Sequence, residues 1–216
     1  MVADDIAVDL KQKRFSFDRY QIQTTEHEFR QVVKDSGLLG KRFSEQRFLS
    51  SYRFSKNGVL LLKMNANEAI AQIIADFLRK KLLSEKKKFS FETVFSHSSK
   101  LEVMRTAQQA GYKVYLYFVC TENPELNIAR VKFRVNKKGH DVPRERIVSR
   151  YKRSLDLLYP AAQLADRAFF FDNSGTKPVL FGSFTMENGR KKWDNMKKQD
   201  VHDWFYKYYS LKTKKR

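Results

Sequence analysis

The sequence predicts an α/β protein built on a mainly parallel sheet with helices on both faces. Strand-like and helix-like segments alternate between residues 89 and 171, which is the pattern of strand–helix–strand units. Residues 113–120 form a continuous β-prone run, typical of a strand that is covered on both faces. Of the 216 residues, 42% are hydrophobic and 14% aromatic, enough for a packed core, so whole-chain disorder is excluded.

Turn and cap residues define the elements of the first half. Asn57-Gly58 separates two apolar runs and predicts a hairpin. Apolar residues at helical spacing predict a helix from Asn65 to about residue 83. Alternation at residues 89–94 predicts a strand, and a helix from Ser99 closes at Gly111.

The second half is punctuated in the same way. Asn123-Pro124 predicts a helix that ends before Gly139, and Pro143 opens another that Pro160 breaks or kinks. The remaining predicted elements are strands at 168–171 and 179–184, a hairpin at Asn188-Gly189 and a final aromatic helix at 201–209. At the carboxyl ends of such strands, α/β sheets bind their ligands.

Charge and composition bound the partners. The 43 Lys and Arg exceed the 24 Asp and Glu, and the net charge of +19 favours anionic partners such as nucleotides, nucleic acid or acidic proteins. No segment approaches the roughly 20 apolar residues of a membrane helix, and the first residues do not resemble a signal peptide, so a cytoplasmic location is expected. The lone Cys120 and four scattered His show no ligand spacing, so no intrinsic metal site is predicted.

Six segments follow one another in order and at natural spacing: FSFETVFSH at 89–97, AGYKVYLYF at 110–118, ARVKFRV at 129–135, GHDVP at 139–143, SRYKRS at 149–154 and FDNSG at 171–175. Together they resemble the zeta-toxin-like P-loop kinases of bacteria. The resemblance covers about residues 69–175, and ADDI at 3–6 is similar to the segment after that family's second strand. It implies a P-loop NTPase-like, three-layer α/β/α fold.

The resemblance also implies a chemistry. The family transfers a phosphoryl group from ATP (or GTP) with Mg²⁺ to a hydroxyl acceptor, best known as the nucleotide sugar UDP-N-acetylglucosamine, and antitoxin proteins hold its toxins in check. By motif position, Asp4 matches the base that accepts the acceptor's proton, and Glu92 and Thr93 match the acceptor site. Arg134 matches a phosphate-contacting arginine. The family's second such arginine falls near His140 here, which leaves that role open, and we expect Arg150 to take it.

One departure from the family matters. The Gly-x-x-x-x-Gly-Lys-Ser/Thr loop that cradles phosphates is absent, because the only Gly-Lys pair, Gly40-Lys41, is followed by Arg42. The chain is therefore expected to lack the family's first strand and P-loop, to bind the nucleotide poorly and to be impaired or inactive as a kinase. Open strand edges beside the lost strand predict self-association.

The sequence leaves two other classes of function open. Basic clusters such as residues 86–88 and 212–216 fit a non-catalytic remnant that binds nucleic acid. An interaction protein that completes its sheet with a strand from another chain is the third reading. In domain terms we expect an incomplete kinase domain at 1–185, with a basic, hairpin-bearing insertion at 11–64, followed by a basic hairpin, helix and tail at 186–216.

Overall fold

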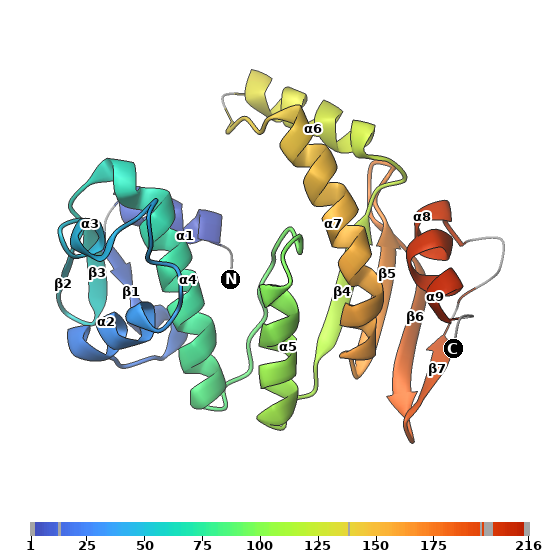
Figure 1. Cartoon of the computed structure of the whole chain (residues 1–216), viewed down its shortest axis with the longest axis horizontal. Helices are drawn as coiled ribbons and strands as arrows, with labels where there is room; N and C mark the ends of the chain where they lie inside the picture. Colours follow the sequence, from blue (N-terminus) through green and yellow to red (C-terminus); the bar gives the residue numbers. More distant parts are fainter. Residues whose placement is uncertain (1–2, 13, 138, 195, 197–200, 214–216) are drawn as a thin grey trace. The chain divides into compact units, whose positions relative to one another are not determined.

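The computed structural model describes residues 3–12, 14–137, 139–194, 196 and 201–213. The chain divides into two compact units, residues 1–93 (unit 1) and residues 94–216 (unit 2). Figure 1 draws the ribbon of both units, coloured from blue at the N-terminal end to red at the C-terminal end. Each unit has its own apolar core.

Unit 1 combines a three-stranded antiparallel sheet, in the order β1-β3-β2, with helices. Its elements are α1 (Ala3–Gln12), β1 (Arg14–Ser16), η1 (Phe17–Tyr20), α2 (Glu26–Lys34), α3 (Glu45–Leu49), β2 (Tyr52–Phe54), β3 (Gly58–Leu61), η2 (Met64–Ala66) and α4 (Asn67–Ser84). The predicted hairpin at Asn57 is confirmed, since β2 and β3 pair across it. Gly58 is required there, because a Cβ would lie 2.2 Å from the Phe15 carbonyl oxygen of β1.

The core of unit 1 is aromatic. Phe17 meets Phe77 at 5.2 Å between ring centroids, and Phe29 meets Phe77 at 5.1 Å, both edge to face. Helix α4 supplies further fully buried side chains, including Ile70 and Ile74. The predicted helix is therefore confirmed, although it begins at Asn67, two residues later than predicted.

Unit 2 holds a four-stranded mixed sheet in the order β4-β5-β6-β7. Its elements are α5 (Ser99–Gln109), β4 (Tyr115–Cys120), α6 (Pro124–Asn136), α7 (Arg144–Gln163), β5 (Arg167–Asp172), β6 (Val179–Glu187), β7 (Arg190–Asp194), α8 (Asp203–Phe205), η4 (Tyr206–Ser210) and α9 (Leu211–Thr213).

The prediction of a mainly parallel sheet is wrong for this unit. Only β4 and β5 are parallel, whereas β5–β6 and β6–β7 are antiparallel. The physical reason is the length of the connections, because a parallel return needs a crossover of a dozen or more residues. Residues 173–178 are too few for one, and the predicted hairpin at Asn188-Gly189, both with positive φ, is confirmed.

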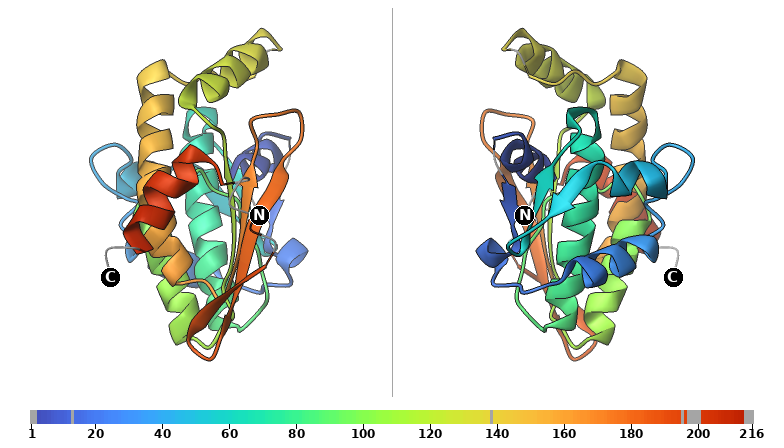
Figure 2. Two further views of the ribbon diagram at one scale, coloured as in Figure 1. Left: turned by 90° about the vertical axis from the view of Figure 1, so that its right-hand side faces the viewer. Right: turned by 90° about the vertical axis from the view of Figure 1, so that its left-hand side faces the viewer.

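Helices of unit 2 cover one face of this sheet (Figure 2). Leu158 of α7 and Phe205 of the C-terminal helical segment share a core with Phe170 of β5. On the other face Tyr115 and Tyr117 are 58% and 61% exposed. The prediction that residues 113–120 are covered on both faces is therefore wrong, because no described helix of unit 2 packs on that side.

Residues 89–94 form no strand, which corrects a third prediction. A strand needs a neighbour to satisfy its backbone groups, and no described strand pairs with this segment. The Phe89 and Phe91 rings stack on each other at 6.3 Å, and the Arg79 guanidinium lies 5.3 Å from the Phe91 centroid. Alternation in the sequence here reflects side-chain packing rather than a ladder.

Local helix signals were better guides. Asn123 caps α6 by accepting the Leu126 N–H at 3.2 Å, and Pro124 is the first helical residue. Gly111, at φ +82°, follows the end of α5 as predicted. Pro160, however, lies inside α7, which continues to Gln163 and is not broken there.

Candidate functional site

The carboxyl ends of β4 and β5 lie side by side because these strands are parallel. Cys120, the last residue of β4, pairs with Asp172, the last residue of β5. Residues 121–123 and 173–175 therefore leave the sheet at the same edge. Ligands of α/β sheets bind at such edges, which makes this edge the candidate functional site of unit 2.

Asp172 and Ser174 lock the two segments together. The Asp172 carboxylate accepts hydrogen bonds from the Ser174 N–H at 3.1 Å and from its hydroxyl at 2.8 Å. The Ser174 hydroxyl oxygen accepts the backbone N–H of Glu122 at 2.8 Å, and the Asn173 N–H donates to the Cys120 carbonyl at 2.7 Å. The backbone at this edge is thus held in one geometry.

Arg130 fastens α6 to the same edge. Its Nη2 donates to the carbonyl oxygens of Asn173 at 2.7 Å and Gly175 at 2.9 Å. The sequence placed Arg130 on one helical face with Arg134 but gave no sign that it binds a loop about 43 residues away. Its contact with FDNSG depends on tertiary structure.

Arg134, the predicted phosphate-contacting residue, lies on the exposed surface of α6. Its Nη2 donates to the His140 carbonyl at 2.8 Å. Gly139 makes this approach possible, since a Cβ there would lie 2.4 Å from Arg134 Cγ and 2.9 Å from the Arg134 carbonyl oxygen. The loop after α6 therefore holds the arginine in place and uses one of its five guanidinium donors.

The other predicted residues are distributed over both units. Arg150 lies half-buried on α7, a helix that contacts α6. Asp4 lies exposed in the first turn of α1, while Glu92 and Thr93 are exposed on the segment without a strand. Arg134 and Arg150 thus belong to two packed helices of unit 2, and Asp4, Glu92 and Thr93 belong to unit 1.

A cluster that the sequence did not reveal joins both strand ends to the C-terminal segment. His202 Nδ1 lies 3.1 Å from Glu122 Oε2 and 3.9 Å from Asp172 Oδ1. The ligand atoms of the three residues lie within 4.8 Å of one another, so they have the chemistry and spacing to hold a divalent cation. His202 and Ser174 already serve as hydrogen-bond partners of the two carboxylates, so the cluster is held together without a cation.

No sequence signal identifies this cluster, because 80 residues separate Glu122 from His202. The position of the histidine is fixed by aromatic packing instead. Its ring lies edge-on to Phe181 at 4.8 Å and stacks on Trp204 at 6.2 Å. His202 therefore anchors the C-terminal helical segment beside the candidate site.

Cys120 is not available as a nucleophile. Burial raises the pKa of its thiol to about 12, so the thiolate population at neutral pH is negligible. Burial also raises the pKa of Tyr151, whose hydroxyl donates to the carbonyl oxygens of Thr121 at 2.9 Å and Glu122 at 3.0 Å. These two side chains are structural supports of the edge.

The described residues do not fit the triphosphate cradle of a P-loop kinase. Gly40 and Phe43 exchange backbone hydrogen bonds at 3.0 and 3.1 Å around the Gly40-Lys41 turn, so their amides are used inside the turn. Phosphate cradles instead present several amides at the start of a helix. The arginines of α6 and α7 suit phosphate oxygens, but no phosphoryl step through a nucleotide can be built on these residues alone.

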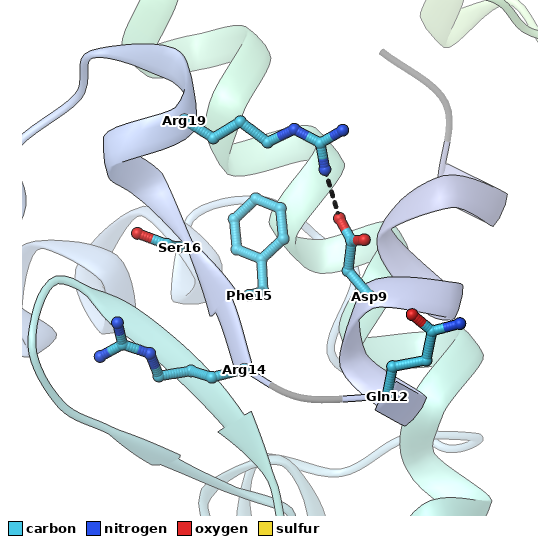
Figure 3. A pocket seen from close by; sticks show the side chains of 6 residues that line it. All are labelled: Asp9, Gln12, Arg14, Phe15, Ser16 and Arg19. Carbon is cyan, nitrogen blue, oxygen red and sulfur yellow. Dashed lines mark hydrogen bonds and ion pairs between the residues drawn. The ribbon is translucent and has the colours of Figure 1, made fainter.

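A small cavity lies in unit 1 between α1, β1 and η1 (Figure 3). Its volume is about 210 Å³, and it is lined by Asp9, Gln12, Arg14, Phe15, Ser16 and Arg19. Arg19 pairs with Asp9 at 2.6 Å, and Arg14 donates to the carbonyl oxygens of Ser55 and Lys56 in the hairpin. These charged groups stabilise the local fold, and none of the predicted site residues lines the cavity.

Comparison with known proteins gives one family. The model of the family described as "Zeta toxin" matches residues 62–177, more than half of the chain. An uncharacterized protein of Haemophilus influenzae is 33% identical over 63 residues, which are 29% of this chain and 45% of that protein. The chain thus spans less than half the length of this curated relative, and no solved structure matches.

None of the helices in the described part of the chain combines the length and apolar composition needed to cross a bilayer.

Proposed function

The chain belongs to the zeta toxin family, and on this premise we propose that it carries the acceptor-binding and lid parts of a nucleoside-triphosphate-dependent kinase. The acceptor we propose is a hydroxyl group of a nucleotide sugar or a related compound. The observation that carries the proposal is the edge beyond β4 and β5, where Arg130 holds α6 against residues 173–175. The family match includes this edge and both arginine-bearing helices.

The arginines of α6 and α7 act on phosphate groups in this proposal. Guanidinium forks match phosphate oxygens better than lysine ammonium groups do. Arg134 is supported by the His140 carbonyl at 2.8 Å, which leaves its other donors for a phosphate. Arg150 supplies a second positive charge from the helix that packs on α6.

Three residues predicted from the sequence have the acceptor roles in this proposal. Asp4 accepts the proton of the acceptor hydroxyl, and Glu92 and Thr93 hydrogen-bond the acceptor; the exposure of all three leaves them accessible to a substrate. ATP or GTP with Mg²⁺ supplies the phosphoryl group and neutralises its charge when bound. We further propose a cytoplasmic location and an antitoxin partner, both from family membership.

The absence of a P-loop from the 216 residues sets the expected rate. Loss of a single preorganised donor costs about 10²–10³ in kcat, and a P-loop supplies several amides, a lysine and a magnesium ligand. We therefore propose that this polypeptide by itself is a very weak or inactive kinase. A polypeptide that includes a P-loop segment ahead of Asp4 is expected to be active.

The experiment measures phosphorylated product by mass spectrometry, with Mg–ATP and UDP-N-acetylglucosamine as substrates. The 216-residue chain should form no product above background, and a version extended by a strand, P-loop and helix should form it. Turnover by the unextended chain at a normal enzyme rate would contradict the proposal that the kinase activity requires a P-loop. No ATP-dependent product from the extended chain would contradict the kinase.

Variants of the extended chain test the acceptor role of Asp4 and the phosphate role of Arg134 separately. Asp4→Asn and Arg134→Gln should each lower kcat by about 10²–10³, while the matched surface change Lys41→Gln should leave it unchanged. Equal rates for all three variants would remove the assigned roles of Asp4 and Arg134 without touching the family assignment.

A further inference from the structure

Positive charge is concentrated on α6, the following loop and the first half of α7. Residues 124–153, here named the arm, contain ten Lys and Arg but only three Asp and Glu. In Figures 1 and 2, α6 and the adjoining end of α7 extend beyond the strands of unit 2. A protruding surface with this charge balance attracts polyanions.

Three arginines of the arm form one row on α7. Arg146, Arg150 and Arg153 follow each other at spacings of four and three residues, so they share a helical face. Arg146 and Arg153 are exposed, while the apolar face of the helix carries the buried Ile147 and Leu155. Among the described residues, no ion pair involves any of the three arginines.

The length of this row indicates an extended ligand. Seven residues of helix separate Arg146 from Arg153, which is about 10 Å along the axis. A row of this length matches successive phosphates of a chain better than the phosphates of one nucleotide. Guanidinium groups bind such oxygens through paired hydrogen bonds.

The arm also presents an exposed aromatic ring. Phe133 of α6 is 63% exposed, and the ammonium group of Lys137 lies 4.5 Å from the centre of its ring. An aromatic ring beside positive charge is the arrangement on which single-stranded nucleic acids stack their bases.

We propose that the arm binds single-stranded nucleic acid, with the arginine row on the phosphodiester backbone and Phe133 against a base. This inference goes beyond the proposed kinase function, since its ligand is a polymer and its row extends past Arg150. The contacts are to backbone and ring faces, so the binding has little sequence preference.

The test is the salt dependence of binding of a fluorescent 20-nucleotide single strand, measured by anisotropy from 50 to 300 mM KCl. The affinity falls as salt rises, and each lost phosphate contact makes the negative slope of log K against log salt less steep by about 0.7 for single strands. Arg146→Gln/Arg153→Gln should therefore reduce the steepness of the slope by about 1.4 and weaken binding about 10- to 30-fold at 0.1 M salt. The matched variant Lys41→Gln/Arg42→Gln, which removes two exposed charges from unit 1, should retain the wild-type slope.

Two further measurements identify the contacts. Phe133→Ala should weaken binding about fivefold or more without a change in slope, because stacking is not ionic. Millimolar ATP should leave the oligonucleotide bound. The proposal is overturned if both double variants lose equal slope, if ATP displaces the strand, or if wild type shows no binding at 50 mM KCl.

Discussion

The strands of unit 1 carry mostly buried and half-buried side chains, whereas one face of the sheet in unit 2 is exposed. In unit 1, Phe17 and Phe29 are fully buried between helices and hairpin. In unit 2, β4 pairs only with β5 among the described strands, and Tyr117 is 61% exposed. Unit 1 thus buries its largest aromatic side chains in its core, while unit 2 leaves aromatic side chains of β4 exposed to solvent.

The largest expected effect is on the core of unit 1. Phe29→Ala removes a ring that contacts Phe17, Phe48 and Phe77, and should lower the free energy of unfolding by about 3–5 kcal/mol. Phe133→Ala, on the exposed arm, is the matched control and should change it by less than about 0.5 kcal/mol. Chemical denaturation measures both, and equal losses would refute the contrast between enclosed and open regions.

A smaller effect is expected at the carboxyl ends of β4 and β5 in unit 2. Arg130→Ala removes two hydrogen bonds from a charged group to the carbonyls of Asn173 and Gly175, and should cost about 1–2 kcal/mol because the site is solvent-exposed. Hydrogen exchange in residues 173–178 should accelerate. Arg134→Ala is the comparison variant and should leave this exchange unchanged. Unchanged exchange in Arg130→Ala as well would show that the Arg130 hydrogen bonds do not order the loop.

The exposed face of β4 is expected to cause self-association. Tyr117 stacks on Phe169 at 4.7 Å, and an open strand edge beside exposed aromatic residues is a template for pairing. Tyr117→Lys should shift the apparent mass in analytical ultracentrifugation toward the monomer by raising the dissociation constant about tenfold. A wild-type chain that is monomeric at all concentrations contradicts this prediction.

The smallest expected effect is a pH dependence in unit 1. Burial disfavours the charged form of Glu28, but hydrogen bonds from Lys81 and Thr24 outweigh it and keep the Glu28 pKa below its usual value. A lowered folded-state pKa contributes stability above the unfolded value of about 4.5, and this is lost as the pH falls further. Because Glu28 is partly exposed, the contribution should be under about 1 kcal/mol.

Denaturant titrations between pH 3 and 7 measure this contribution. Glu28→Gln should flatten the loss of stability below pH 4.5, and Glu68→Gln, at an exposed position on α4, should not. An identical acid profile for wild type and Glu28→Gln would show that the pair with Lys81 contributes nothing.

Much of the local structure followed from the sequence. Asn123-Pro124 specified the start of α6, since the asparagine oxygen and the ring of proline act within one turn. Asn188-Gly189 specified the β6–β7 hairpin, because both residues accept positive φ. The six segments that resemble zeta toxins also identified the family. These signals need no distant partner.

The rest depended on contacts between distant parts of the chain. The alternating pattern at residues 89–94 is equally compatible with a strand and with packed phenylalanines. No described strand pairs with this segment, and that decided between the two. The sequence likewise did not indicate that Arg130 binds residues 173–175 or that Glu122 lies beside His202. Asp4, Glu92, Thr93, Arg134 and Arg150 remain predictions of function.

The sequence alone specified the family, the start of α6, the two hairpins and the lack of a phosphate-cradling loop in these 216 residues. Contacts between distant residues decided the mixed sheet, the exposed face of β4, the binding of Arg130 to residues 173–175 and the position of His202 beside the ends of β4 and β5. The physical reason is range: caps and turns are satisfied within a few residues, whereas burial and strand pairing depend on neighbours that only the folded chain supplies.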